Sequence, residues 1–120
     1  WAVSWWNPQS PSAIKFSQGM LKAKNIDKIK FCMVYESLGA LPVRDFANGT
    51  KAIDKLTGDM EYFRDNYFSH SSYLYMNGRP VVYVYVARSW KNFTQDMLMH
   101  IKEKVGLDIL FIADIPYFGL

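Results

Sequence analysis

The sequence is poor in the residues that build disulfide frameworks, metal sites and phosphate loops. It has one cysteine, Cys32, so no disulfide framework forms within one chain. The apolar run around Cys32 predicts a small buried side chain. The two histidines, His70 and His100, lack the i, i+4 partner that a helical metal site uses. No glycine-rich phosphate loop follows any predicted strand. We therefore expect no metal and no cofactor.

Long apolar runs and a basic stripe are also missing. The longest apolar stretches, 81–87 and 109–115, are too short to cross a bilayer as helices. Charged residues make up 21% of the chain, with a net charge of +3, and lysines and arginines are interspersed with acids. We expect neither a transmembrane segment nor a nucleic-acid partner.

Hydrophobic and aromatic residues are plentiful. Half of the 120 residues are hydrophobic, which is enough for one domain with a real core. Aromatics reach 17%, and several stand near the ends of predicted strands rather than inside helices. This placement favours a ligand that stacks on aromatic rings.

Strand and helix patterns alternate along the chain. Near-continuous apolar runs, typical of parallel strands covered on both faces, occupy 1–6, 29–35, 80–87 and 108–114. Apolar residues at spacings of three and four predict helices opening at Pro11 and spanning about 50–66 and 92–105. Asn77-Gly78 predicts a turn with positive φ, and Pro80 begins the strand after it.

The order βαβαβαβ implies a parallel sheet with right-handed crossovers. An open, doubly wound sheet is complete with four or five strands, whereas an eight-stranded barrel needs about 250 residues. Length favours the open sheet. The long aromatic loops after the strands favour the working face of a barrel. The pattern by itself leaves both folds open.

The strand ends carry the reactive groups. Trp5 and Trp6 follow the first strand, Glu36 the second, Tyr85 the third and Asp114 the fourth, within the segment 114–117. In a parallel sheet these ends share one edge. Aromatic rings stack on the C–H faces of sugars, and carboxylates bind the hydroxyls around them. We therefore expect a carbohydrate site, and these five residues are the candidates for its lining.

Each candidate also has a structural alternative. Glu36 would otherwise cap the next segment or pair with Arg44 or Arg88. Asp114 would otherwise cap a helix entrance. Adjacent residues in a strand point to opposite sides, so at most one of Trp5 and Trp6 lines a pocket. Glycosidic cleavage uses two carboxylates about 5 to 9 Å apart, a distance that the sequence does not supply.

Several segments resemble glycoside hydrolase family 99 and its relatives. The resemblance is carried by Tyr67-Phe68-Ser69-His70, by Tyr73-Leu74 and by Asn77-Gly78-Arg79-Pro80-Val81-Val82-Tyr83-Val84-Tyr85. Val3-Ser4-Trp5-Trp6, Met33-Val34-Tyr35-Glu36 and the strand 107–112 are similar to further strands of that family, in the same order.

The resemblance implies a (β/α)₈ barrel acting as an endo-α-mannosidase or α-mannanase, with retention of configuration, help from the 2-hydroxyl of the substrate and no metal. It decides the fold prediction: one domain over 1–120, a partial parallel (β/α) barrel of TIM type with about four βα units, cut at both ends. The family's catalytic carboxylates lie in a Glu-Trp-His-Glu-like stretch that this sequence lacks. Glu36-Ser37 stands where the family has Glu-Pro, and Val34 where it has His.

We therefore expect part of the sugar-binding face of a family 99-like hydrolase acting on α-mannose-containing glycans, inactive alone. Two alternatives stay open: a non-catalytic carbohydrate-binding or surface-assembly protein, and a self-contained open α/β sheet that binds another small ligand. A partial barrel exposes strand edges, so its protein partner would be the rest of the barrel or a second copy. The tripeptides at Asn48 and Asn92 match the glycosylation acceptor pattern and fit an extracytoplasmic or secreted protein.

Overall fold

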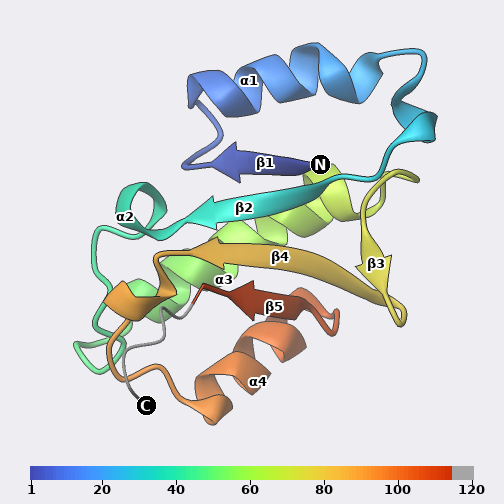
Figure 1. The fold of residues 1–120 in the computed structure, drawn as a ribbon. Helices are drawn as coiled ribbons and strands as arrows, with labels where there is room; N and C mark the ends of the chain where they lie inside the picture. The colour runs from blue at the N-terminus through green and yellow to red at the C-terminus, as the bar shows by residue number, and fades with distance from the viewer. Residues whose placement is uncertain (115–120) are drawn as a thin grey trace.

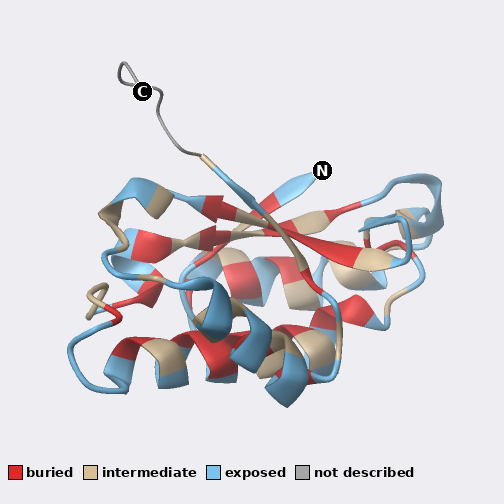
Figure 2. Ribbon diagram, turned by 90° about the horizontal axis from the view of Figure 1, so that it is seen from below, coloured by how far each residue is buried: buried red, intermediate tan, exposed pale blue. Residues whose placement is uncertain are grey.

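The computed structural model describes residues 1–114. It is a five-stranded sheet with its three longer helices on one face (Figures 1 and 2). The strands are β1 (Ala2–Trp5), β2 (Cys32–Glu36), β3 (Tyr75–Met76), β4 (Arg79–Tyr85) and β5 (Leu110–Ala113). β1 pairs with β2, β2 with β4, and β4 with β5, all in parallel. The remainder of the predicted strand-end segment, 115–117, lies outside the described residues.

The prediction of a partial parallel barrel of TIM type is wrong. β3 pairs antiparallel with the start of β4, so the sheet is mixed and its order, β1-β2-β4-β3, differs from that of a parallel βα repeat. The reason is local. Asn77 (φ 52°) and Gly78 (φ 74°) are left-handed and form a two-residue turn whose twist suits a hairpin. The predicted turn is thus confirmed, and it folds Tyr75–Met76 back onto β4.

The predicted helices are present with shifted ends. They are α1 (Pro11–Gln18), α3 (Lys51–Phe63) and α4 (Gln95–Val105), with a further single turn, α2 (Ser37–Ala40), directly after β2. The Ser10 hydroxyl accepts a hydrogen bond from Ala13 N at the start of α1, and the Thr94 hydroxyl does the same for Met97 N in α4. Short helical turns occupy η1 (Met20–Lys22), η2 (Ile26–Lys28), η3 (Arg64–Phe68, a π-helix) and η4 (Ala87–Ser89).

An aromatic cluster fills the space between the sheet and its helices. Trp5 from β1 and Tyr35 from β2 are fully buried, and the Trp5 ring meets Phe63 of α3 edge-on at 4.9 Å between centroids. Leu56 and Met60 of α3 complete the same apolar stripe. Burying side chains of this size stabilises the fold by about 1.5–3 kcal/mol each. This core fixes which strand residues point toward the helices.

A buried carboxyl group, that of Asp59, contacts this core. The Tyr35 hydroxyl donates to Asp59 Oδ2 at 2.6 Å, and Lys55 Nζ lies 2.5 Å from the same oxygen. Burial raises the pKa of the Asp59 carboxyl, against the lowering effect of the hydrogen bonds from Lys55 and Tyr35. Burial together with the Asp59 charge also raises the pKa of Tyr35.

None of the three longer helices, α1, α3 and α4, covers the opposite face of the sheet (Figure 2). One row of neighbouring side chains crosses this face from β2 through β4 to β5. It consists of Val34, Tyr83 and Ile112, because Val34 pairs with Tyr83 and Tyr83 with Ile112. We call Cys32, Val34, Tyr83, Leu110 and Ile112 the uncovered face. These side chains are at most partly buried, whereas Met33 and Val82, which point toward the helices, are fully buried. The partly buried Cys32 departs from the predicted buried side chain.

Candidate functional site

The five predicted site residues stand at the carboxyl ends of the four parallel strands. Trp5 ends β1, Glu36 ends β2 and Tyr85 ends β4, while Trp6 and Asp114 follow β1 and β5. The structure brings the ends together but gives the side chains different surroundings. Trp5 has no exposed surface, and it packs between the sheet and α3.

Trp6, Glu36 and Tyr85 form a row across three neighbouring strands, which we call the edge row. Glu36 pairs with Tyr85 in the β2–β4 register. Trp6 and Glu36 each directly follow the paired residues Trp5 and Tyr35. Neighbouring strands lie about 4.8 Å apart. The edge row therefore presents a carboxylate between an indole that is 44% exposed and a phenol that is 49% exposed.

The Trp6 indole is held against α2. A Cβ atom added at Gly39 would lie 3.0 Å from Trp6 Cδ1, so the lack of a side chain at Gly39 permits this close approach. The indole thus packs on the α2 backbone while nearly half of its surface stays exposed. This arrangement suits a flat stacking platform.

Neither structural alternative for Glu36 is observed among residues 1–114. Glu36 precedes α2 but its side chain makes no capping hydrogen bond. Arg44 instead donates through Nη1 to the Leu41 carbonyl oxygen at 2.8 Å, and the ion pairs of the described residues include neither Glu36 nor Arg88. The Glu36 carboxylate is therefore available to bind hydroxyl groups.

Asp114 is engaged with the protein backbone. Its Oδ1 accepts a hydrogen bond from Ala87 N at 2.9 Å, and its own N–H donates to the Val84 carbonyl oxygen at 3.2 Å. The predicted alternative was a cap at a helix entrance. Asp114 does cap a helical turn, η4, but η4 follows the neighbouring strand β4, whereas Asp114 itself follows β5.

The loops after β2 and β4 are joined beside the edge row. Trp90 Nε1 donates to the hydroxyl oxygen of the buried Ser37, the residue after Glu36, at 2.9 Å. Asn92 Nδ2 donates to Asp45 Oδ1 at 3.0 Å. That hydrogen bond, with a second from Ala47 N, lowers the pKa of Asp45. The two loops thus form one connected rim.

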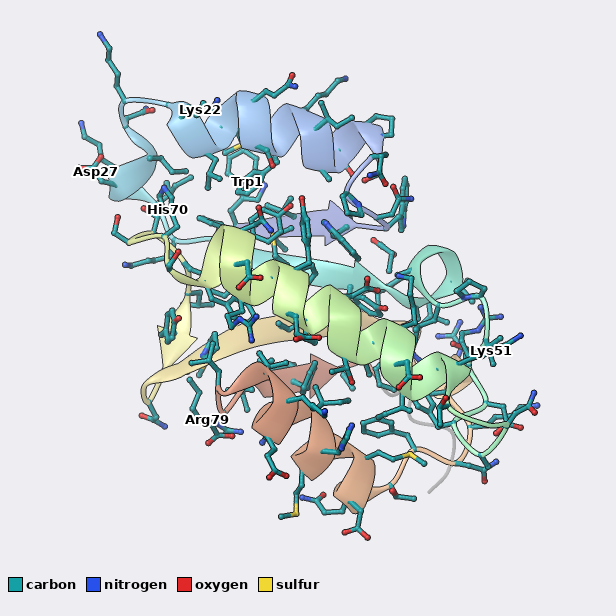
Figure 3. The ribbon with its side chains drawn as sticks, turned by 180° about the vertical axis from the view of Figure 1, so that it is seen from behind. Trp1, Lys22, Asp27, Lys51, His70 and Arg79 are labelled. Atoms are coloured by element: carbon teal, nitrogen blue, oxygen red, sulfur yellow. The ribbon has the colours of Figure 1, made fainter. Side chains whose placement is uncertain are left out.

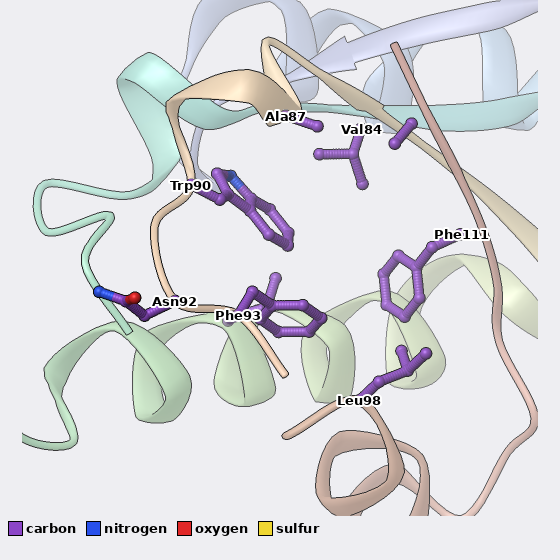
Figure 4. A pocket seen from close by; sticks show the side chains of 9 residues that line it. Val84, Ala87, Trp90, Asn92, Phe93, Leu98 and Phe111 are labelled. Atoms are coloured by element: carbon purple, nitrogen blue, oxygen red, sulfur yellow. The ribbon is translucent and has the colours of Figure 1, made fainter. Parts of the chain in front are cut away.

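A separate apolar cavity of about 330 Å³ lies on the helix side of β4 and β5. Figure 4 shows the Trp90, Phe93, Leu98 and Phe111 side chains turned toward this space. The full lining is Leu56, Val84, Ala87, Trp90, Asn92, Phe93, Leu98, Phe111 and Ala113. The only hydrogen-bonding side chains in this lining belong to Trp90 and Asn92, so the cavity suits an apolar ligand better than a sugar.

The other polar residues considered in the sequence lie elsewhere. His70 and Arg79 are at the end of the sheet where the strands begin, far from Lys51 at the start of α3 (Figure 3). His70 Nδ1 accepts a hydrogen bond from Ser72 N, and Arg79 pairs with Asp108. Within residues 1–114 no three histidine, cysteine or acidic side chains converge as metal ligands would.

Sequence reasoning missed the roles of Ser37, Gly39 and Trp90. The sequence places Trp90 in one of the aromatic loops that follow the strands but gives it no partner, and no local pattern distinguishes Gly39 from other glycines. Each role depends on a contact between segments that are far apart in the chain. Only the tryptophan in the loop after β4 offered a sequence signal.

No protein-family model, curated protein or solved structure matches this chain. Across the described part of the chain, no helix has the length and apolar character needed to span a membrane.

Proposed function

We propose that the edge row binds an α-mannoside-like glycan and that the chain does not cleave it alone. The observation that carries the proposal is the Glu36 carboxylate, which has no ion pair or capping hydrogen bond among residues 1–114 and lies between two exposed aromatic side chains. The rings supply stacking surface for the C–H faces of a sugar, and Glu36 accepts hydrogen bonds from its hydroxyls.

The motif resemblance to glycoside hydrolase family 99 suggests mannose as the sugar and a hydrolase as the parent protein. Cleavage needs a pair of carboxylates flanking one bond. Asp114, the second carboxylate at this edge, is committed to Ala87 N through one oxygen. This engagement supports a binding role for the described residues rather than a hydrolytic one.

Titration calorimetry with an α-linked mannobiose tests the proposal. Glu36→Gln should weaken binding about tenfold or more, since a hydrogen bond to a charged group contributes about 1.5–3 kcal/mol. Glu103→Gln, an exposed acid on α4, is the matched control and should leave affinity unchanged. Trp6→Ala should weaken binding about three- to tenfold, and Trp1→Ala, which removes another exposed indole, should not.

Two results would contradict the proposal. Equal affinity of the wild-type protein, Glu36→Gln and Trp6→Ala would remove the edge row as the binding site. Hydrolysis of the mannobiose by the wild-type protein, abolished in Glu36→Gln, would show that the chain is a catalyst.

An apolar small ligand is a second candidate, favoured by the cavity between β4, β5, α3 and α4. Apart from Asn92, its lining residues are aromatic and aliphatic, and a mostly apolar lining is common to small-ligand sites. An apolar fluorescent probe should bind with an affinity that falls in Phe93→Ala but not in Trp6→Ala. The reverse pattern would assign the probe to the edge row.

Self-association through the uncovered face is part of the proposal for partners. Contiguous apolar surface of this kind marks interaction sites on proteins. Sedimentation velocity should show association that weakens in Tyr83→Ser, while Tyr62→Ser on the helix side should leave the association unchanged. A monomer at all concentrations would contradict this proposal.

A further inference from the structure

Val86, directly after the edge-row residue Tyr85, has a left-handed backbone conformation. Its φ and ψ are 58° and 41°, and its side chain is buried. Left-handed backbone crowds Cβ against the following carbonyl oxygen and is rare for β-branched residues. Such strain persists only where the surrounding structure holds it, and it clusters at functional sites.

Asp114 holds the chain on both sides of this residue. Its N–H donates to the Val84 carbonyl oxygen, and its Oδ1 accepts from Ala87 N. Asp114, which follows β5, therefore makes one hydrogen bond before and one after the pair Tyr85 and Val86. The Val86 carbonyl oxygen also accepts from Ser89 N and from the Ser89 hydroxyl, which closes the turn that follows.

We infer that Asp114 is a positioning residue: it holds Val86 in the left-handed turn, and the turn sets the Tyr85 ring beside Glu36 in the edge row. The inference rests on the proposed sugar-binding function and replaces the expected direct contact of Asp114 with sugar. Without these two hydrogen bonds of Asp114, Val86 relaxes toward right-handed or extended backbone, and Tyr85 loses its place in the register with Glu36.

A double-mutant cycle between positions 114 and 85 tests this role, with affinity for the α-linked mannobiose as the readout. Asp114→Ala should weaken binding about three- to tenfold, the contribution of one stacked ring. The same substitution in a Tyr85→Ala background should cost nothing further, because the ring it positions is gone. Asp114→Asn keeps an oxygen that accepts from Ala87 N and should retain nearly full affinity.

Amide hydrogen exchange at Ala87 gives a readout without sugar. Exchange of this N–H should accelerate in Asp114→Ala and stay slow in Asp114→Asn. If Asp114→Ala fails to fold, Asp114→Asn and its combination with Tyr85→Ala still test the inference, because a direct sugar contact by the carboxylate would make Asp114→Asn weaken binding in both backgrounds.

The outcomes separate this inference from the proposed function. If Asp114→Ala costs the same affinity with and without Tyr85, Asp114 binds the sugar directly and the positioning role is wrong. Unchanged affinity in Asp114→Ala would also overturn it, with the function intact. No binding by the folded wild-type protein would refute the proposed function and this role with it, whatever the exchange rate at Ala87.

Discussion

Trp5 and Trp6 are neighbours in the chain, yet the fold gives them opposite surroundings. Trp5 belongs to the helix-covered face of the sheet, where it packs against Phe63 and is fully buried. Trp6 belongs to the edge row, where it rests on Gly39 and stays partly exposed. The same residue type thus contributes to the core at one position, and at the next it leaves nearly half of its surface exposed at the strand ends.

The two regions also treat carboxylates differently. Asp59, on the helix-covered side, is buried and bonded to Tyr35 and Lys55. Glu36, in the edge row, has neither an ion pair nor a capping hydrogen bond among residues 1–114. Burial without partners is costly, so a carboxylate can remain unengaged only at an edge that water or a ligand reaches.

The largest contrast is expected between the two tryptophans. Trp5→Ala should lower the free energy of unfolding by about 3–5 kcal/mol, because it leaves a cavity among packed rings. Trp6→Ala should lower it by less than about 1 kcal/mol, since much of the indole is already exposed. Urea denaturation followed by circular dichroism measures both. Equal losses would mean that the edge row is part of the core.

The next contrast lies between two tyrosines. The buried Tyr73 hydroxyl donates to the Val81 carbonyl oxygen at 2.6 Å and accepts from Met33 N at 3.1 Å. Tyr73→Phe should cost about 1–3 kcal/mol, because it leaves these two buried backbone groups without a partner. Tyr75→Phe removes one hydrogen bond from a more exposed ring and is the control. A larger loss in Tyr75→Phe would contradict this account.

Asp59 should make stability depend on pH. Burial raises its folded-state pKa above the unfolded value near 4, so the folded protein binds this proton more tightly. Its contribution to stability is full below about pH 4 and is lost as pH rises through the folded-state pKa. The free energy of unfolding of the wild-type protein, measured relative to Asp59→Asn by urea denaturation, should therefore fall as pH rises from about 4 through the folded-state pKa of Asp59.

Asp54→Asn, an exposed acid on the same helix, is the control for the Asp59 curve. If the stability difference between wild type and Asp59→Asn instead grew as pH rose above about 4, the carboxylate would be stabilised by its two hydrogen bonds more than it is penalised by burial.

The smallest effect on stability is expected at Glu36. Glu36→Gln should change the free energy of unfolding by no more than about 0.5 kcal/mol, because no contact among the described residues depends on its charge. This near-neutrality should accompany the loss of mannobiose affinity. Thermal unfolding of Glu36→Gln beside Glu103→Gln measures it, and a loss above about 2 kcal/mol would place Glu36 in the structure rather than in the site.

Periodicity predicted most of the regular elements. The apolar runs marked β1, β2, β4 and β5 within a few residues, and the stripe containing Leu56, Met60 and Phe63 marked α3. β3 was missed although its turn was predicted, because two residues carry no measurable periodicity. That hairpin makes the sheet mixed, so the predicted fold class failed on its shortest strand.

The candidate site was predicted as a set of strand ends, and the structure divided that set. Alternation along a strand says that Trp5 and Trp6 face opposite sides, but not which side the helices cover. Asp114 ends a strand in the sequence, but its bond to Ala87 joins residues 27 positions apart. The resemblance to a glycosidase family stays a prediction.

Local patterns in the sequence were enough to locate the strands and helices and to show which residue types gather at the strand ends, because these follow from periodicity and turn residues. The folded chain added that the helices cover one face, that β3 folds back on β4, and that Trp5 is core while Trp6, Glu36 and Tyr85 form an edge row. These outcomes depend on contacts between distant segments, whose packing and hydrogen bonds no local pattern encodes.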